Sequence, residues 1–210
     1  STLSSSSAAS DVYKRQLMTD VVIIGGGIAG MSACAQLAPY VKVILLEAEP
    51  GLCYHSSGRS AATFIEDYGN RVTKELNKAS LTFLKSESHG FLKKRGLLLL
   101  GKKGEEAQFQ TDSEDLGLKY ISVDEAFKFI PALNRESITR QAYRPDVYDI
   151  DTNKLYEYYR KSALENGAQI RKKTKLKSAY QKNKKWEIES VDGDISASAL
   201  INAAGAWADK

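Results

Sequence analysis

The sequence predicts an α/β fold in which helices cover a parallel β-sheet, and three observations near the start of the chain support this. A short apolar run, Val21 to Ile24, ends in consecutive glycines, which is typical of a fully buried parallel strand. The next segment, Ile28 to Ala38, has the small and apolar residues of a packed helix and stops at Pro39. A second apolar run, Val41 to Leu46, completes a β-α-β unit within about 28 residues, and such a crossover is right-handed.

The composition excludes several classes of protein. The chain has 210 residues, 42% of them hydrophobic and 27% charged, so one domain or two small interleaved domains are expected. A net charge of +4 predicts neither a nucleic-acid partner nor an anionic membrane. No apolar run reaches the roughly 18 residues of a membrane-spanning helix, so none is expected. Two cysteines, Cys34 and Cys53, are too few for a disulfide framework and lack metal-ligand spacing, which fits a cytoplasmic protein without a metal site.

The remaining segments are assigned in chain order. Residues 1–17 are Ser-rich, polar and aperiodic, which predicts a non-native or disordered tail ahead of a start at Met18. A turn-rich loop covers Glu49 to Arg59, and Ala61 to Glu87 reads as mostly helical with an interruption near Tyr68. Further predicted helices are Glu105–Leu116, Val123–Phe129 and Thr152–Glu165, and further predicted strands are Gly96–Gly101, Thr139–Arg144, Gln169–Arg171, Lys175–Tyr180, Lys185–Ser190, Asp194–Ser196 and Ala199–Ala204.

The glycines between the first strand and the first helix predict a dinucleotide site. Gly25, Gly27 and Gly30 satisfy the G-x-G-x-x-G pattern in its required strand-to-helix context. They permit, in turn, a tight bend, close approach of the backbone to a pyrophosphate, and close packing of helix on strand. Unpaired N–H groups and the dipole at the helix start favour the phosphates. Glu47, which ends the second strand, is placed to accept hydrogen bonds from ribose hydroxyls and to repel a 2′-phosphate.

The stretch that follows distinguishes FAD from NAD. An NAD-binding fold would continue with alternating strands and helices, whereas here Tyr54 to Ala62 reads Tyr-His-Ser-Ser-Gly-Arg-Ser-Ala-Ala. This stretch resembles the FAD-dependent D-amino-acid oxidase and glycine oxidase superfamily, in particular its D-arginine dehydrogenase-like members, which are D-amino-acid dehydrogenases. The closing segment, Ile201 to Trp207, resembles the late strand and turn of the same family.

The resemblance implies a fold and a division of the chain. The fold is an FAD-binding Rossmann-type, glutathione-reductase-like domain with a parallel sheet and a β-meander, plus part of an inserted α+β substrate domain. Residues 18–91 would form the first part of the FAD-binding domain, 92–147 the first part of the substrate domain, and 148–210 the second part of the FAD-binding domain. Members of the family are longer, so the resemblance implies an N-terminal fragment that is inactive alone and exposes apolar surface.

The resemblance and the glycine motif together assign the cofactor-binding residues, with FAD held non-covalently. His55 resembles a histidine that carries covalent FAD in some relatives, but the nearest motif belongs to enzymes without that bond. Arg59 is a candidate partner of a phosphate or a flavin carbonyl, and a solvated surface arginine is the alternative. The full set is Gly25, Gly27, Ile28, Ala29, Gly30, Glu47, Ala48, His55, Ser56, Ser57, Gly58, Arg59, Ser60, Ala61, Ala62, Leu176, Ala203, Ala204, Gly205 and Trp207.

The activity implied by the resemblance is oxidation of the CH–NH bond of an amino acid or similar amine. A hydride passes to flavin N5, and the resulting imine is hydrolysed to a 2-oxo acid. Tyr68, beside Gly69, resembles a mobile tyrosine that covers the substrate. No arginine is assigned to the substrate carboxylate, and the electron acceptor is left open. The family members that act on cationic D-amino acids carry a carboxylate near the first strand of the substrate domain, where this chain has Lys94 and Arg95. The resemblance therefore implies a neutral or acidic substrate side chain in preference to a cationic one.

Two alternatives stay open on the sequence alone. The first is an FAD-dependent 2-hydroxy acid dehydrogenase of the same fold, and the second is an inactive nucleotide-binding fragment. A basic run from Arg171 to Lys185 lacks the interleaved aromatic residues of a nucleic-acid site. Its lysines are predicted to lie on solvent-exposed faces of strands, so no nucleic-acid partner is expected.

Overall fold

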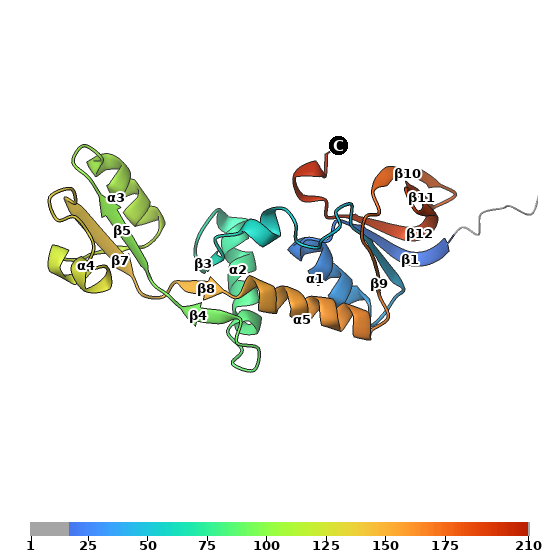
Figure 1. Ribbon diagram of the computed structural model, residues 1–210, viewed down its shortest axis with the longest axis horizontal. Coiled ribbons are helices and arrows are strands. Elements are labelled where there is room, and N and C mark those ends of the chain that lie inside the picture. The colour runs from blue at the N-terminus through green and yellow to red at the C-terminus, as the bar shows by residue number, and fades with distance from the viewer. Residues whose placement is uncertain (1–16, 210) are drawn as a thin grey trace, which may run out of the picture. The chain divides into compact units, whose positions relative to one another are not determined.

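The structure, a computed structural model, describes residues 17–209 and divides into two compact units. The first unit combines the described residues up to Ser60 with those from Asn153 onward, and the second comprises Ala61–Thr152. Residues 1–16 of the predicted tail lie outside the described residues. Figure 1 labels most of the helices and strands of both units.

A six-stranded sheet forms the first unit, and it confirms the predicted parallel sheet with a β-meander. The strand order is β10-β11-β12-β1-β2-β9. The central strand β1 runs parallel to both β2 and β12, and β2 runs parallel to β9, whereas β10, β11 and β12 are antiparallel neighbours. The strands are β1 (Leu17–Ile24), β2 (Val43–Leu46), β9 (Gln169–Arg171), β10 (Leu176–Lys182), β11 (Lys185–Ser190) and β12 (Gly193–Asn202).

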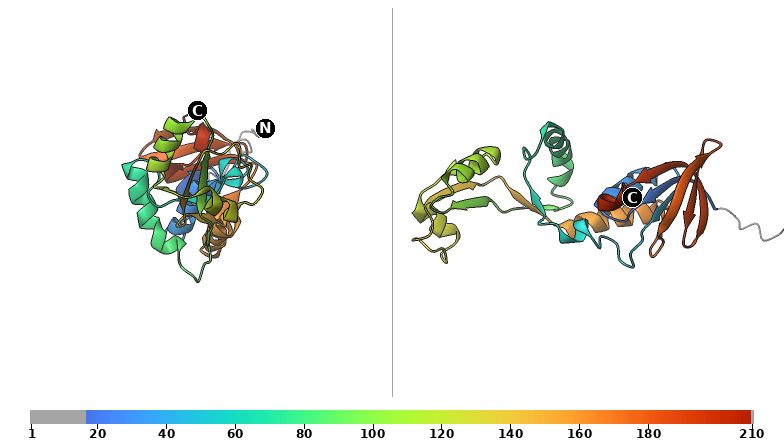
Figure 2. Two further views of the ribbon diagram at one scale, coloured as in Figure 1. Left: turned by 90° about the vertical axis from the view of Figure 1, so that its left-hand side faces the viewer. Right: turned by 90° about the horizontal axis from the view of Figure 1, so that it is seen from above.

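The two faces of this sheet are buried differently. On one face, α1 (Ile28–Leu37) and α5 (Thr152–Glu165) pack against β1 and β2. Figure 1 and Figure 2 show both helices, α1 in blue and α5 in orange, beside this sheet. Met31 of α1 and Ile23 and Leu45 of the strands are fully buried in that cluster. On the other face, Val22 and Ile44 lie in a second cluster with β11 and β12 side chains. Alternate residues of β1 therefore face alternate cores, as burial on both faces requires.

Two predicted boundaries in this unit were wrong. Leu17, assigned to the tail, is the first residue of β1 and pairs with Ile195, because β12 extends far enough to continue the parallel ladder. The two predicted strands Asp194–Ser196 and Ala199–Ala204 are one strand, β12. Its Ser-containing middle has low strand propensity, but pairing with β1 on one side and β11 on the other outweighs that preference.

The second unit contains two small antiparallel sheets and three helices. Their strand orders are β3-β8-β4 and β5-β7-β6. The elements are β3 (Thr63–Phe64), α2 (Arg71–Leu84), β4 (Leu92–Lys94), β5 (Leu97–Gly101), α3 (Glu106–Asp115), β6 (Lys119–Tyr120), α4 (Val123–Phe129), β7 (Arg140–Arg144) and β8 (Tyr148–Ile150). Its boundaries differ from the predicted substrate-domain segment 92–147, since the compact unit also takes in the segments on either side.

The predicted helix over Ala61–Glu87 was wrong in its first ten residues. Gly69 adopts a φ of +95°, which a helix does not allow, and Asn70 caps α2 by accepting a hydrogen bond from the N–H of Thr73 at 3.0 Å. The segment before them instead contains the short strand β3, which pairs with β8, and then a turn in which the N–H of Tyr68 donates to the carbonyl of Ile65 at 3.3 Å. Helix α2 therefore begins at Arg71.

A buried arginine ties several segments of the second unit together. The Arg144 side chain is 10% exposed and donates to Asp67 at 2.6 Å, to both carboxylate oxygens of Asp146 at 3.1 and 3.2 Å, and to the carbonyl of Leu116 at 2.9 Å. These bonds hold the pKa of Asp146 below its usual value. The guanidinium thus links β7 to the loop before α2 and to the end of α3.

No helix between residues 17 and 209 combines the length and the apolar character needed to span a bilayer.

Candidate dinucleotide-binding site

The three motif glycines lie at the carboxyl end of β1, where backbone segments meet closely. Gly25 has a φ of +106°, and its N–H donates to the carbonyl of Leu46 at 2.8 Å. A Cβ on Gly25 would collide with the backbone of Ala203, and a Cβ on Gly30 would collide with the carbonyl oxygen of Gly25. Two of the predicted glycine roles, the tight bend and the close helix–strand approach, therefore have a steric basis in the structure.

The start of α1 presents N–H groups at this turn. Gly27 is the N-cap residue and supplies no side-chain cap. Ile28 donates its N–H to the hydroxyl of Ser57 at 3.0 Å, and among the described residues no partner is found for the N–H groups of Ala29 and Gly30. Both Ile28 and Ala29 are exposed. A helix start whose N–H groups have no partner within the protein suits an anion such as a diphosphate.

Glu47 connects the second strand to the glycine turn. Its carboxylate accepts the N–H of Gly26 at 2.7 Å through Oε2 and the N–H of Glu49 at 2.8 Å through Oε1. Its own carbonyl accepts the N–H of Thr174 at 2.8 Å. Each carboxylate oxygen has a second acceptor site, so these bonds orient the side chain and leave capacity for ribose hydroxyls.

The Tyr54–Ser60 segment folds beside this turn. Residues Ser56–Arg59 form a short 3₁₀ helix, and a Cβ on Gly58 would collide with the carbonyl of Cys53. Ser57 reaches Ile28, as described above. The exposed guanidinium of Arg59 lies 5.8 Å from the centre of the Tyr54 ring, an arrangement in which the arginine faces solvent and an aromatic surface.

The two segments that carry the family resemblance are in contact. The N–H of Ala203 donates to the carbonyl of Ile24 at 2.8 Å, which extends the parallel ladder past β12. A 3₁₀ helix, Gly205–Trp207, follows, and the Trp207 ring lies 4.4 Å from the His55 ring between centroids. The Nε2 atom of His55 is 3.0 Å from Oε1 of Glu49. Residues far apart in sequence thus converge at the carboxyl ends of β1, β2 and β12.

Other predicted residues lie around or apart from this centre. Ala48, Ser56, Ser60 and Gly205 are exposed, and Ala204 donates its N–H to the Asn202 side chain at 3.2 Å. Leu176 begins β10, two residues after Thr174, and packs in the second core cluster. Ala61, Ala62 and Tyr68 belong to the second compact unit, where Ala62 has a φ of +55° and Tyr68 is 56% exposed.

Sequence reasoning missed two residues of the site, Tyr156 and Cys53. The Tyr156 hydroxyl donates to the carbonyl of Gly26 at 2.8 Å, and the Cys53 N–H donates to the same oxygen at 3.2 Å. Burial raises the pKa of both side chains above their ordinary values. No local pattern signals a contact across 130 positions of sequence, so the helix that carries Tyr156 gave no reason to assign this residue to the site.

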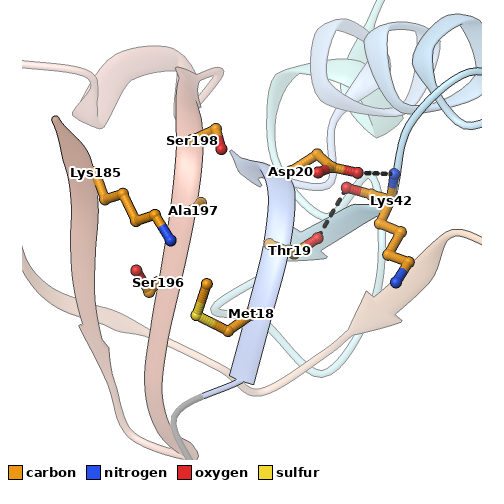
Figure 3. Close-up of a pocket in the computed structure, with 8 residues that line it drawn as sticks. All are labelled: Met18, Thr19, Asp20, Lys42, Lys185, Ser196, Ala197 and Ser198. Atoms are coloured by element: carbon orange, nitrogen blue, oxygen red, sulfur yellow. Dashed lines mark hydrogen bonds between the residues drawn. The ribbon is translucent and has the colours of Figure 1, made fainter.

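A cavity of about 250 Å³ lies elsewhere in the first unit (Figure 3). It is lined by Met18 to Asp20 of β1 and Ser196 to Ser198 of β12, with Lys42 and Lys185. The Thr19 hydroxyl donates to the carbonyl of Lys42 at 2.8 Å, and the Lys42 N–H donates to the Asp20 carboxylate at 2.8 Å. Because this cavity lies at the amino end of β1, it is distinct from the glycine turn, and α/β sheets bind ligands at the carboxyl ends of their strands.

The donor set at the carboxyl end fits a dinucleotide. It combines glycine positions where an added Cβ would collide with neighbouring backbone, helix-start N–H groups, unpartnered in the described part of the chain, for phosphate oxygens, and an oriented carboxylate for a ribose. Among residues 17–209, no group of three or more His, Cys, Asp or Glu side chains is arranged to hold a metal ion.

Comparison with known proteins agrees with this chemistry. The family described as "FAD dependent oxidoreductase" matches residues 20–210. Monomeric sarcosine oxidase from Bacillus sp. (strain B-0618) is 27% identical over 203 residues, which cover 91% of this chain and 52% of the relative. Glycerol-3-phosphate dehydrogenase from Pseudomonas tolaasii is 26% identical over 220 residues, which cover 91% of this chain and 40% of the relative.

Solved structures show the same fold. Glycine oxidase from Geobacillus kaustophilus has a TM-score of 0.77 at 22% identity, covering 92% of this chain and 57% of the other. L-proline dehydrogenase from P. horikoshii has a TM-score of 0.75 at 24% identity, covering 92% and 54%. The chain therefore spans about half the length of the proteins it matches. The family match covers nearly the whole of this chain, and FAD is the cofactor that the family implies. The chain therefore belongs to the FAD dependent oxidoreductase family.

Proposed function

We propose that this chain forms part of an enzyme that oxidises the CH–NH bond of an amino acid or a related small amine, giving an imine and then a 2-oxo acid. The observation that carries the proposal is the similarity to monomeric sarcosine oxidase over 91% of the chain. FAD supplies the redox chemistry by accepting the hydride, and the protein supplies binding and orientation. A D-amino acid or a glycine-type amine is the proposed substrate class, and the D-arginine dehydrogenase-like branch stays a prediction.

The glycine turn is proposed to hold the diphosphate of FAD. The N–H groups of Ala29 and Gly30 have no partner among the described residues, and the Ser57 hydroxyl, already bonded to Ile28, retains a proton to donate to a phosphate oxygen. Glu47 is proposed to accept the ribose hydroxyls, held in place by its bonds to Gly26 and Glu49. Arg59 is exposed and is proposed to add a positive charge on the same side.

We further propose that the flavin is bound without a covalent link. His55 already has two neighbours, the Glu49 carboxylate at 3.0 Å and the Trp207 ring, and these suit a histidine that orients the loop. Acid precipitation of the flavin-loaded protein tests this point. Flavin fluorescence should leave with the supernatant, and fluorescence retained in the protein pellet would show a covalent bond.

The second compact unit is proposed to contribute to substrate binding, with residues 92–147 as the first part of the substrate domain. Tyr68, exposed and followed by Gly69 at a φ of +95°, is the proposed cover over the substrate. Substitution of Tyr68 by Phe or Ala should raise the substrate KM while leaving FAD affinity unchanged. A cytoplasmic location is also proposed, supported by Cys34 and Cys53, which are both free thiols.

One alternative function is favoured by a specific observation. The similarity to glycerol-3-phosphate dehydrogenases supports oxidation of a CH–OH bond, the chemistry also expected of a 2-hydroxy acid dehydrogenase on this fold. The reaction products separate the two proposals. Oxidation of a CH–OH bond gives a carbonyl compound without release of ammonia, whereas oxidation of a CH–NH bond gives an imine that water hydrolyses.

The test is a turnover assay with an artificial electron acceptor. Sarcosine, glycine and a panel of D- and L-amino acids are compared with glycerol 3-phosphate and 2-hydroxy acids. Since the chain spans about half of its relatives, the assay uses both this chain and the longest polypeptide that its gene encodes. Acceptor reduction with ammonia or methylamine release supports amine oxidation. Reduction only with the hydroxy compounds would overturn it in favour of the alternative.

A further inference from the structure

The carbonyl group of Gly26 is held by a side chain from a distant part of the chain. Tyr156, on α5, donates its hydroxyl to this carbonyl at 2.8 Å, and the N–H of Cys53 donates to the same oxygen at 3.2 Å. The N–H of Gly26 donates to Glu47 at 2.7 Å. Both polar groups of the middle glycine are therefore bound, and Tyr156 is the partner that comes from outside the turn and its neighbouring loop.

The surroundings of Tyr156 leave its hydroxyl little freedom. The residue is 6% exposed, and its ring packs in the same core cluster as Met31 and Cys34 of α1. The hydroxyl also lies in hydrogen-bond contact with the Cys53 thiol. A buried hydroxyl is destabilised without an acceptor, so the Gly26 carbonyl and the phenol orient each other.

The orientation of this carbonyl determines the direction of the next N–H group. The Gly26–Gly27 peptide is planar, so the direction of its carbonyl fixes the direction of the Gly27 N–H. Gly27 is the N-cap of α1 and stands directly before the first N–H groups of the helix. A rotation of this peptide would change the geometry that a diphosphate meets at the helix start.

We propose that Tyr156 is a positioning residue of the dinucleotide site, which sets the Gly26–Gly27 peptide so that the start of α1 is arranged for the diphosphate before FAD binds. This inference rests on the proposed binding of the FAD diphosphate at the glycine turn. It adds to that site a determinant from α5, a helix that the glycine motif does not include.

The experiment compares Tyr156→Phe with the wild type, and Tyr158→Phe serves as the matched control. Both substitutions remove one hydroxyl from α5, but Tyr158 is 38% exposed and Tyr156 is buried. In the FAD-free chain, the ¹⁵N and ¹H shifts of the Gly27 amide report the state of the preceding carbonyl. In titrations with FAD, the dissociation constant and the ³¹P shifts of the bound diphosphate report its placement.

We expect Tyr156→Phe to move the Gly27 amide signal, to weaken FAD binding by about three- to tenfold, and to shift the bound ³¹P signals. Tyr158→Phe should do none of these. A general loss of stability would not move the ³¹P signals of the FAD that is still bound, so that readout separates positioning from a merely structural role.

Each other outcome contradicts a different statement. An unmoved Gly27 amide would overturn the inference even if FAD binds normally to the wild type. A moved amide with unchanged FAD affinity and ³¹P shifts would overturn the positioning role. Wild-type chain without FAD affinity would overturn the proposed site, and with it any role of Tyr156 toward FAD, while the moved amide would still show the hydroxyl–carbonyl bond.

Discussion

The contact between Gly30 and the carbonyl of Gly25 leads to a prediction that can be worked out from the structure. Replacing Gly30 by Ala places a Cβ far inside van der Waals distance of that carbonyl oxygen, 3.1 Å from its carbon and 3.4 Å from the Cγ2 atom of Ile23. The first two obstacles are backbone atoms of the β1–α1 turn. They cannot rotate away as a flexible side chain can, so either α1 or the turn must shift.

Two opposing terms set the change in the free energy of unfolding that Gly30→Ala causes. Alanine is about 1 kcal/mol better than glycine within a helix, and the φ of Gly30 is not in the left-handed region, so the backbone itself accepts alanine. Overpacking of a tight contact costs roughly 1–3 kcal/mol, and this contact involves backbone, which favours the upper part of that range. We expect a net loss of about 1–2 kcal/mol in the free energy of unfolding, together with at least about tenfold weaker FAD binding, because the displaced Gly25 carbonyl belongs to the diphosphate turn.

The assay is urea unfolding followed by circular dichroism, combined with FAD titration by fluorescence. Gly51→Ala is the matched control, since its added Cβ meets nothing within 4 Å and its φ is also ordinary. The control should bind FAD normally and gain up to about 1 kcal/mol by restricting the unfolded chain. Equal stability and equal FAD affinity of Gly30→Ala and the wild type would refute the steric argument.

Three further predictions concern stability. Lys184→Gly should raise the free energy of unfolding by about 1 kcal/mol, because Asn183 and Lys184 join β10 to β11 with φ values of +51° and +63°, which suit Asn-Gly. Arg144→Met should cost about 2–3 kcal/mol at neutral pH by removing a buried hub of hydrogen bonds. Since the folded pKa of Asp146 lies below its unfolded value, this arginine stabilises the fold above the unfolded pKa, and the wild type should lose that advantage as the pH falls below about 4. Burial raises the pKa of the Cys34 thiol to about 11. The stabilisation of the fold by the neutral thiol should therefore be complete below pH 9 and should be lost as the pH rises toward 11.

These three predictions are checked by urea unfolding, with the pH varied in the last two. Lys182→Gly, at the end of β10 and outside the two positive-φ positions, is the control for the turn and should not stabilise. For the arginine, equal acid sensitivity of wild type and Arg144→Met would contradict the linkage. For the cysteine, Cys34→Ala should show a shallower loss of stability between pH 9 and 11, and parallel curves would exclude the thiol as the cause.

The fold of the first unit was largely predictable because its signals are local. A buried strand, a glycine turn and a helix follow one another within Val21–Leu37, and each step depends on neighbours in sequence. The short strands of the second unit were missed for the opposite reason. Strand β3 has two residues and β8 has three, and each is a strand because it pairs with a distant segment. Their own propensity carries almost no information.

The candidate site shows the same division. The glycine turn and Glu47 could be predicted from the sequence because their spacing follows from the geometry of a β-α-β unit. The Tyr156 contact was not found, since a tyrosine in an amphipathic helix is ordinary and its acceptor is a backbone carbonyl, which every residue has. That His55 would lie against Trp207 was likewise not predictable from spacing, although both residues had been assigned to the site.

The position of β1 at the middle of its sheet has a consequence for biosynthesis. One of its two neighbours, β12, is encoded near the other end of the described chain, and Ile23 pairs with Ile201. A ribosome that adds about 5–20 residues per second needs roughly ten to forty seconds between these two strands. Throughout that interval one side of a strongly apolar strand has no native partner, so the nascent polypeptide exposes an edge at which it can pair with another copy.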